Sequence, residues 1–396
     1  MVRPFHIALP DDIKKGLTTD VYFVRTKKIL KALKMDKLRV TMEVTSGSLP
    51  RGWSWAVFCG LDDVLTLLEG IPVDLYSFPE GTLFKPYDMD GLRIPVMVIE
   101  GPYGEFCIYE TPLLGLVCQA SGIATMAARV KKAAGDKVVL GFGIRRMHPA
   151  LAPMIDRASY IGGVDGVSSI IGAEAIGKKP MGTMPHALII VLGDQVKAWK
   201  SFDQVVEKDV PRIALVDTFY DEKVEAVMAA EALGERLYGV RLDTPGSRKG
   251  DFAAIVREVK WELKVRGYEN VKIIVSGGLN EENIPALAEA GADGFGVGTS
   301  ISNAPTVDFA MDIVAVEGKP LAKRGKFSGR KQVWRCPKCL VDYVRLIEEK
   351  APRCRLCGGE TKPLLRKYME NGEVLVREGV DEIRERVLSQ LEKLSL

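Results

Sequence analysis

The sequence predicts an α/β protein made of an incomplete α/β barrel, an N-terminal α+β domain and a small module around four cysteines. From 137 to 299, short apolar runs alternate with amphipathic segments, a pattern typical of parallel strands joined by helices. The stretch before Glu110 is rich in strand-forming residues between Gly and Pro turns. Four cysteines lie close together near the C-terminus. We expect domains over 1–112, 113–305 and 334–362, with strands of about 306–333 and 363–396 completing the N-terminal domain.

Composition excludes several classes of protein. A chain of 396 residues with 47% hydrophobic and 27% charged residues is long and apolar enough for two to three folded domains. Its net charge of only +3 argues against a nucleic-acid surface spread over a whole domain. No continuous apolar run approaches the ~18 residues of a membrane helix. Pro4 and the pair Asp11-Asp12 interrupt any signal peptide, so we expect a cytoplasmic protein with no membrane partner.

The barrel region holds too few units to close. Its expected strands are 137–142, 165–170, 181–183, 212–218, 238–243, 271–276 and 294–298. Between them lie helical patterns such as 221–237, in which Val224, Val227 and Met228 share one face. A closed eight-unit barrel takes ~250 residues. The sequence therefore predicts an incomplete barrel or an open doubly wound sheet.

Outside the barrel region, the sequence predicts further strands and a terminal helix. The expected strands are 39–44, 82–84 and 94–100 before the barrel, and 312–317 and 374–376 after it. The charged, amphipathic stretch 381–396 is expected to form a helix.

The four cysteines predict a metal site. Cys336, Cys339, Cys354 and Cys357 have the spacing C-x2-C-x14-C-x2-C, in which two knuckles present four thiolates to tetrahedral zinc. Four protein ligands leave no open position, so this zinc is expected to be structural. The scattered Cys59, Cys107 and Cys118 are expected to lie in the core.

Polar and glycine residues follow most of the expected barrel strands, at the end where parallel α/β folds build their sites. Gly277 and Gly278 follow one strand, and Gly298 with Thr299 follows the next. Backbone amides in such glycine loops approach anions closely, which predicts a phosphate site. The structural alternative is that these glycines only make tight turns.

Charged residues at the other strand ends point to an anionic substrate. Arg145 and Arg146 are placed to clamp a phosphate or carboxylate, although a solvated pair is the alternative. Arg241 and Asp243 are two residues apart on one strand and therefore face the same side, as a structural ion pair or as ligand contacts. Asp217 on the preceding strand favours the second interpretation, because two carboxylates can hold sugar hydroxyls or magnesium.

The chain has three histidines. His6 is near a terminus and is expected to be inert, and His148 precedes a proline, as a helix cap does. His186 follows Thr183 and Pro185 at a strand-to-helix turn, where its imidazole would face the cleft. By position alone, a structural role for His186 is the commoner outcome.

Taken together, these residues resemble the nicotinate phosphoribosyltransferase family, which includes nicotinamide phosphoribosyltransferase and is distantly related to quinolinate phosphoribosyltransferase. The four-cysteine module resembles a short archaeal-type branch. The matching segments are Thr19-Asp20-Val21-Tyr22, Glu110-Thr111-Pro112, Ser121-Gly122-Ile123-Ala124-Thr125, Phe142-Gly143-Ile144-Arg145-Arg146, Gly182-Thr183 with His186, Val216-Asp217-Thr218 and Arg241-Leu242-Asp243-Thr244.

The resemblance implies a type II phosphoribosyltransferase fold and the transfer of a phosphoribosyl group from phosphoribosyl pyrophosphate to nicotinate, in NAD biosynthesis. It implies magnesium with the pyrophosphate and ATP as a co-substrate that phosphorylates a histidine. The implied catalytic residues are His186, Asp217, Arg241 and Asp243. The implied substrate-binding residues are Tyr22, Phe142, Arg145, Arg146, Ser168, Thr183, Gly277, Gly278, Gly298 and Thr299. Tyr22 would come from a second subunit, which implies a homodimer or higher homo-oligomer with shared sites.

Three points stay open at the level of sequence. Thr244-Pro245-Gly246-Ser247 lacks the family's SGD continuation, which leaves the metal arrangement undecided. Glu174 would favour nicotinamide if it faced the ring substituent, whereas Ser168 and Arg145 would suit nicotinate. The alternatives are quinolinate or nicotinamide phosphoribosyltransferase and, from another class, a zinc-ribbon protein that contacts nucleic acid through its basic flank.

Overall fold

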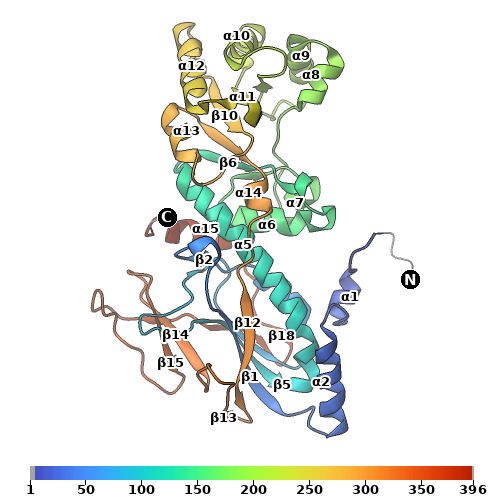
Figure 1. Ribbon diagram of the computed structural model, residues 1–396, viewed down its shortest axis with the longest axis vertical. Helices are drawn as coiled ribbons and strands as arrows, with labels where there is room; N and C mark the ends of the chain where they lie inside the picture. Colours follow the sequence, from blue (N-terminus) through green and yellow to red (C-terminus); the bar gives the residue numbers. More distant parts are fainter. Residues whose placement is uncertain (1–4, 395–396) are drawn as a thin grey trace. The chain divides into compact units, whose positions relative to one another are not determined.

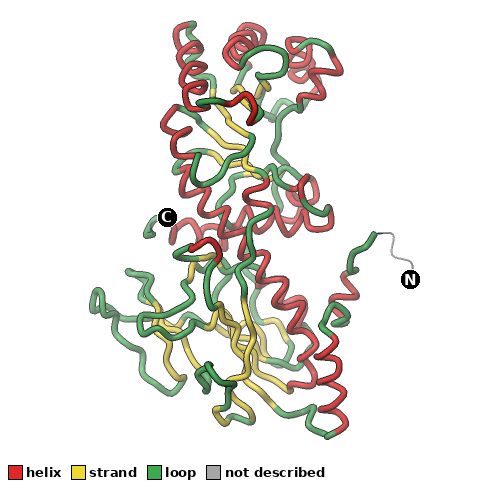
Figure 2. The backbone as a smooth tube through the Cα atoms, in the orientation of Figure 1, coloured by secondary structure: helices red, strands yellow, loops and turns green. Residues whose placement is uncertain are grey.

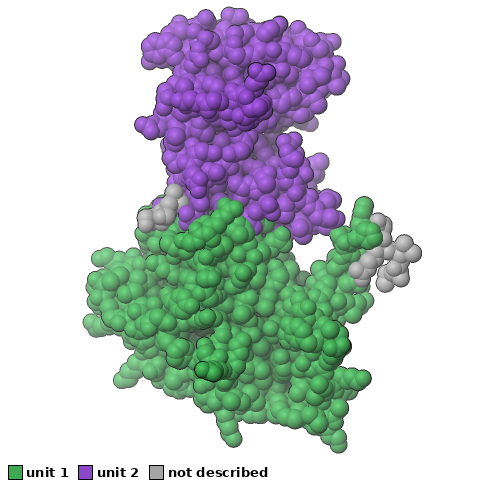
Figure 3. Space-filling model, in the orientation of Figure 1, with its two compact units in different colours: residues 1–125, 305–395 green, residues 126–304, 396 purple. Residues whose placement is uncertain are grey.

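The computed structural model describes residues 5–394 and divides into two compact units (Figures 1 and 3). Unit 1 contains the chain up to Thr125 and from Pro305 onward, and unit 2 is Met126–Ala304. The mixed α/β architecture predicted from the sequence is confirmed.

Unit 2 is built on a parallel sheet that does not close. Within the described residues the sheet has six strands in the order β7-β6-β11-β10-β9-β8, so β7 and β8 form its two edges. The strands are β6 (Val138–Gly141), β7 (Gly166–Val167), β8 (Ile213–Leu215), β9 (Gly239–Leu242), β10 (Lys272–Ser276) and β11 (Gly294–Val297). This open arrangement is the incomplete barrel of the prediction.

Helices connect these strands (Figure 2). They are α6 (Ala152–Ile161), α7 (Ile170–Ala175), α8 (His186–Leu192), α9 (Gln195–Val205), α10 (Glu222–Leu233), α11 (Gly246–Lys249), α12 (Phe252–Val265), α13 (Ile284–Ala290) and α14 (Thr299–Ser302). Aspartates begin three of them: the side chains of Asp194, Asp221 and Asp251 each accept a hydrogen bond from a backbone N–H in the first turn. The predicted helix 221–237 is shorter than expected, because Gly234 leaves helical geometry with φ of 55°.

One predicted strand of unit 2 is wrong. Residues 181–183 form a loop, although Met181 N donates to Val167 O over 2.8 Å. Pro180 and Pro185 bracket this loop, and a proline has no N–H with which to continue a strand ladder. Met181 is the one large apolar side chain among these three residues, and a single hydrogen bond does not extend a sheet.

Unit 1 contains a sheet in which three strands from the N-terminal part of the chain lie between two pairs of strands from its C-terminal part. Its order is β13-β12-β1-β5-β3-β17-β18. The strands are β1 (Arg39–Ser46), β3 (Asp74–Ser77), β5 (Pro95–Pro102), β12 (Phe309–Val316), β13 (Lys319–Pro320), β17 (Arg366–Glu370) and β18 (Glu373–Val374). β1 pairs antiparallel with both β5 and β12. The predicted strand 82–84 instead pairs in a separate ribbon, β2 (Ala56–Val57) with β4 (Leu83–Phe84).

The remaining elements of unit 1 are helices and the cysteine module. The helices are α1 (Pro10–Lys14), α2 (Val21–Ala32), α3 (Leu61–Leu68), α4 (Tyr103–Phe106), α5 (Glu110–Ala134), whose last residues belong to unit 2, and α15 (Val380–Leu391). Short 3-10 turns are η1 (Pro50–Gly52), η2 (Cys107–Tyr109), η3 (Ile144–Arg146), η4 (Pro149–Leu151) and η5 (Gly234–Arg236). The module has three strands, β14 (Lys331–Arg335), β15 (Asp342–Leu346) and β16 (Lys362–Pro363). The predicted terminal helix forms as α15, and residues 395–396 of that prediction lie outside the described residues.

The segment Tyr103–Ala134 is long and apolar enough to cross a membrane by length and hydropathy alone. It contains no uninterrupted apolar run, because polar residues are scattered through it. Of its most apolar window, 67% is buried, as expected for a core helix. Within α5, Ser121 Oγ accepts from Cys59 N over 3.0 Å and Thr125 Oγ1 accepts from Val57 N over 2.8 Å. These hydroxyls fix the helix against the β2 segment.

Gly122 lies between these two hydroxyl residues and permits a close backbone approach. A Cβ at this position would lie 2.2 Å from the carbonyl oxygen of Pro305. Gly122→Ala should therefore lower the free energy of unfolding by about 1–3 kcal/mol, measured by urea denaturation. Gly115→Ala on the same helix meets no atom within 4 Å and should instead stabilise by about 0.5–1 kcal/mol. Equal effects of the two substitutions would contradict this account.

Candidate active site

A cleft of about 730 Å³ lies at the carboxyl ends of the parallel strands of unit 2. A volume of this size holds a substrate of several rings and phosphates. Twelve of the residues predicted from the sequence line it: Phe142, Arg145, Arg146, Ser168, Thr183, His186, Arg241, Asp243, Gly277, Gly278, Gly298 and Thr299.

Asp217 lies just beneath the lining, at the end of β8. Its side chain is 4% exposed, and its Oδ2 accepts from Asp243 N over 2.7 Å. Its Oδ1 is buried without a hydrogen-bond partner. Burial raises the pKa of Asp217 to about 7, with the charge of Asp243 adding to the rise and the Asp243 N–H opposing it. A carboxyl group held in this way gains from a cation or a hydroxyl donor that enters the cleft.

His186 begins α8 and faces both carboxylates. Its Nε2 is 3.6 Å from Asp217 Oδ1 and 3.9 Å from Asp243 Oδ2, and its Nδ1 is 3.0 Å from Thr218 Oγ1. Burial lowers the pKa of His186, against the opposing effect of Asp243. The imidazole is therefore mostly neutral at pH 7, as a nucleophile or metal ligand must be.

Arg241 supplies a positive charge with unused donors. Its side chain is 11% exposed, its Nη2 donates to Met184 O over 3.2 Å and lies 3.7 Å from Asp243 Oδ2. Its Nε is buried without a partner. The guanidinium carbon lies 6.0 Å from the centre of the Phe142 ring. This group is arranged to bind an anion beside an aromatic face.

The glycine loops have the backbone geometry of a phosphate site. Gly277 and Gly278 have φ of 86° and 69°, backbone angles that residues other than glycine rarely adopt. A Cβ at Gly277 would also lie 3.2 Å from Asp243 Oδ1. Lys249 Nζ donates to Gly277 O, which adds a cation beside the loop. Sequence reasoning missed Lys249, although a lysine six residues after Asp243 was visible.

Glu225 was also missed, and it positions the turn that carries Asp217. Its buried carboxylate accepts four backbone N–H groups, from residues 217–220, over 2.7–3.1 Å. Charge-assisted bonds of this kind are about twice as strong as neutral ones. In the sequence, Glu225 reads as a surface charge near the start of a helix.

Other predicted residues lie elsewhere. Tyr22 is on α2 of unit 1 and is 54% exposed. Glu174 is exposed on α7 and is not among the residues that line the cleft. The prediction that His148 is a cap is confirmed, since its Nδ1 accepts from Ala150 N over 3.2 Å in η4.

The four module cysteines converge as their spacing predicts. Their sulfur atoms all lie within 4.8 Å of one another, and Cys336 Sγ is 3.6 Å from Cys357 Sγ. Zn–S bonds of ~2.3 Å in a tetrahedron place sulfurs ~3.8 Å apart, so the geometry suits a metal ion of this size. Among the other cysteines, Cys59 and Cys107 are buried as expected, whereas Cys118 is half-buried.

Comparisons with known proteins decide the family. Models of the quinolinate phosphoribosyl transferase N-terminal and C-terminal domains match residues 20–121 and 123–312. Nicotinate phosphoribosyltransferase pncB2 of Mycobacterium tuberculosis is 31% identical, covering 81% of this chain and 75% of the relative. The nicotinate phosphoribosyltransferase of Bacillus subtilis is 32% identical, covering 85% of this chain and 77% of the relative. The chain belongs to the nicotinate phosphoribosyltransferase family.

Solved structures agree with this membership. The nicotinate-nucleotide pyrophosphorylase of Pyrococcus furiosus is 58% identical with a TM-score of 0.95 over 100% of both chains. Human nicotinic acid phosphoribosyltransferase shares the fold, with a TM-score of 0.74 at 21% identity over 95% of this chain and 94% of the human one. The cleft of this family member thus lies on a fold that its relatives share.

The buried Asp217 predicts a pH-dependent stability. Its folded pKa of about 7 lies above the ~3.9 of an unfolded aspartate, so ionisation destabilises the fold as pH rises from about 4 through 7. Asp217→Asn keeps the acceptor for Asp243 N but cannot ionise. Its stability relative to the parent should rise between pH 5 and pH 8, by at most about 3 kcal/mol in urea titrations.

The control for this measurement is Asp251→Asn, which changes an exposed helix cap into another good cap. This variant should keep the parent's pH dependence. Parallel stability curves for the parent and Asp217→Asn would show that burial does not hold this proton.

Proposed function

We propose that this protein is a nicotinate phosphoribosyltransferase. The pyridine nitrogen of nicotinate forms a bond to the anomeric carbon of phosphoribosyl pyrophosphate as the bond to pyrophosphate breaks. The products are nicotinate mononucleotide and pyrophosphate. One observation carries the proposal: two carboxylates, a buried arginine and two glycine loops surround a single cleft in a member of this family. The reaction supplies NAD biosynthesis. We assign the protein to the cytoplasm, because its cysteines are free thiols and its long apolar helix is mostly buried.

The sugar phosphate occupies the glycine side of the cleft. The 5′-phosphate binds the backbone of Gly277, Gly278 and Gly298 and the hydroxyl of Thr299, with Lys249 adding charge. Asp243 holds the ribose hydroxyls, because its carboxylate lines the cleft. Because the transition state carries positive charge on the sugar, neighbouring carboxylates stabilise it.

The leaving pyrophosphate lies at the arginine side. Arg241, Arg145 and Arg146 offset its developing charge. Magnesium fits beside them, because oxygen ligands suit this ion and Asp217 Oδ1 has no other partner. When bound, the ion supplies positive charge to the pyrophosphate oxygens.

The pyridine ring stacks on Phe142, with Ser168 and Arg145 at its carboxylate. Tyr22 covers the other face from a second subunit, which makes the working form a homodimer or larger homo-oligomer. The exposure of the Tyr22 ring supports this assignment, since an aromatic side chain gains from such a partner.

ATP acts as co-substrate through phosphorylation of His186. The neutral imidazole between two carboxylates supports this step, because both a nucleophilic nitrogen and places for a cation are present. The phosphorylated ring would organise charge near the pyrophosphate.

Quinolinate is the second candidate substrate, because both matching domain models are of quinolinate phosphoribosyl transferase. Its two carboxylates call for more positive charge than nicotinate does. Among the described residues that line the cleft, the basic ones are Arg145, Arg146 and Arg241, and these also serve the pyrophosphate. We therefore place nicotinate first. The exposed Glu174 gives no support to a nicotinamide preference.

A nucleic-acid role for the cysteine module is less well supported. Three of the basic residues around it are already paired within the chain: Lys331 with Glu43 at 2.8 Å, Arg335 with Asp342 at 2.6 Å, and Arg355 with Asp90 at 2.5 Å. Paired cations give little of the counterion release that drives binding to phosphates.

The test of the activity is a mass-spectrometric product assay with phosphoribosyl pyrophosphate and magnesium. Nicotinate, nicotinamide and quinolinate are offered in parallel, with and without ATP. Nicotinate mononucleotide should form from nicotinate, and Arg241→Met should lower kcat/KM about 100-fold or more. His186→Ala should abolish any ATP stimulation, whereas His148→Ala, outside the cleft, should keep it. Product from quinolinate alone would overturn the assignment.

We assign structural zinc to the cysteine module. Metal analysis should find about one zinc ion per chain, and Cys354→Ser should lose it and lower Tm by about 5 °C or more. Cys118→Ser is the control, because Cys118 Sγ accepts from Phe309 N and a hydroxyl can replace it. Full zinc content in the Cys354 variant would refute the assignment.

A further inference from the structure

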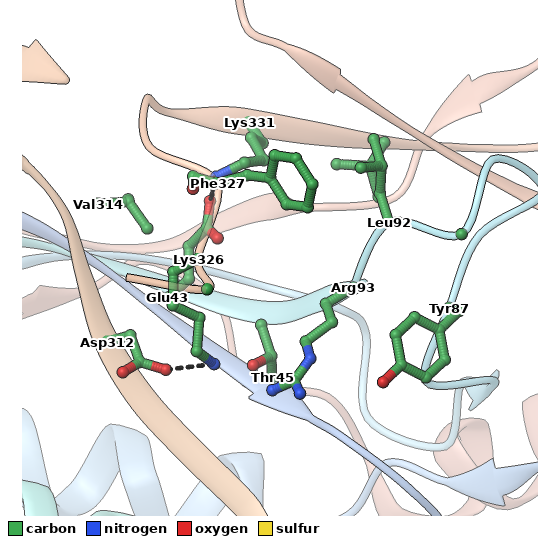
Figure 4. A pocket seen from close by; sticks show the side chains of 13 residues that line it. Glu43, Thr45, Tyr87, Leu92, Arg93, Asp312, Val314, Lys326, Phe327 and Lys331 are labelled. Atoms are coloured by element: carbon green, nitrogen blue, oxygen red, sulfur yellow. Dashed lines mark hydrogen bonds and ion pairs between the residues drawn. The ribbon is translucent and has the colours of Figure 1, made fainter. Parts of the chain in front are cut away.

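Unit 1 contains a cavity of its own, of about 110 Å³ (Figure 4). Glu43 and Thr45 from β1 and Asp312 from β12 line it together with residues of two loops, 87–93 and 325–331. All of the lining residues belong to unit 1, so this cavity is distinct from the cleft of unit 2.

The carboxylates of the cavity are already neutralised. Glu43 pairs with Lys331 at 2.8 Å, and Asp312 pairs with Lys326 at 2.5 Å and with Lys323 at 2.6 Å. The dashed line in Figure 4 marks the pair between Asp312 and Lys326. These acids therefore offer little attraction to a further cation.

Arg93 is the cation of the cavity that lacks a partner. Within residues 5–394, its guanidinium forms no ion pair and no hydrogen bond, whereas Lys326 and Lys331 each have a carboxylate. It lies close to Gly47, where a Cβ would be 3.4 Å from Arg93 Nη2. In Figure 4 its side chain extends along the cavity toward Thr45. The lining thus has three cations against two carboxylates, with the excess charge on Arg93.

Thr45 adds an unused polar atom next to this charge. Its side chain lines the cavity, the residue is only 4% exposed, and its Oγ1 is buried without a hydrogen-bond partner. A buried hydroxyl without a partner costs about 1–3 kcal/mol. A ligand oxygen in the cavity would satisfy it.

The other part of the lining is apolar. It consists of the side chains of Leu92, Phe327, Val314 and Val344 and the ring of Tyr87. The Tyr87 hydroxyl donates to Gly47 O over 3.0 Å, so the polar end of that ring is already satisfied. The cavity therefore combines one cationic, hydrogen-bonding end with an aliphatic and aromatic body.

The loop that carries Arg93 is held in place before any ligand arrives. Asp88 Oδ1 accepts from Asp90 N and Leu92 N, each over 2.8 Å, and Asp88 Oδ2 accepts from Val344 N over 2.7 Å. Asp90 in turn pairs with Arg345 at 3.0 Å. A wall fixed by these bonds has little ordering entropy to lose on binding.

We propose that this cavity is a binding site for a small aromatic monocarboxylate. Its carboxylate accepts from the Arg93 guanidinium and from Thr45 Oγ1, and its ring packs against Phe327 and Leu92. The cavity is partly open to solvent, so its volume of about 110 Å³ has to hold only the carboxylate and the inner edge of a single small ring, and it is too small for a nucleotide. The proposal does not depend on the reaction assigned to unit 2.

Benzoate is the probe, because it has the ring and the carboxylate but no ring nitrogen on which a phosphoribosyl group could be placed. Binding is measured by titration calorimetry on the full chain carrying Phe142→Ala, which weakens binding of a ring in the cleft of unit 2. This variant should still bind benzoate. Adding Arg93→Gln should weaken that binding about 10- to 100-fold, and adding Thr45→Val should weaken it about 3- to 10-fold.

Arg257→Gln, which removes an exposed arginine from α12, is the matched control and should leave benzoate binding unchanged. Thermal unfolding confirms that each variant is folded, and Thr45→Val keeps the test valid if the arginine variant is not. Unchanged benzoate affinity in both the Arg93→Gln and the Thr45→Val variants would overturn the proposal. So would the loss of all benzoate binding with Phe142→Ala alone.

Discussion

The turn between β8 and α10 depends on one buried carboxylate, that of Glu225. By accepting four successive backbone N–H groups, it fixes the backbone of residues 217–220. Asp217 and Thr218 then present their oxygens to His186, and Asp217 accepts from the backbone of the neighbouring strand end. The geometry of the cleft thus begins with a group that does not line it.

Buried polar groups in this protein fall into two physical classes. Lys331 with Glu43 and Arg335 with Asp342 are paired and hydrogen-bonded, and they hold strands together. Asp217 Oδ1, Arg241 Nε and Thr45 Oγ1 are buried without partners. Each such atom costs free energy in the empty protein, and a ligand that pairs with it recovers that cost. These three atoms lie at the two places to which ligands are assigned above, Asp217 and Arg241 at the cleft and Thr45 at the cavity of unit 1.

The sequence was most informative where apolar periodicity and strand ends coincide. Six barrel strands and the polar groups that follow them could be predicted, because burial on both faces requires continuous apolar runs. The strand predicted at 181–183 was wrong, because the flanking Pro180 and Pro185 have no N–H to donate to a strand ladder. In the sequence, Glu225 and Lys249 look like ordinary surface charges, and only the folded structure places them against the backbone of the strand ends. The cavity at Thr45 and Arg93 could not be predicted at all, since it depends on β1 lying beside β12.

That strand pairing also has a consequence for the order in which the protein can fold. β1 has β5 on one side and β12 on the other, and all of unit 2 lies between β5 and β12 in the chain. During synthesis, one edge of β1 therefore stays open until unit 2 has been made. Unit 2 draws its sheet from a continuous stretch and can form first. The nascent chain thus carries an unpaired strand edge until β12 has been made, and such an edge can pair with strands of other chains.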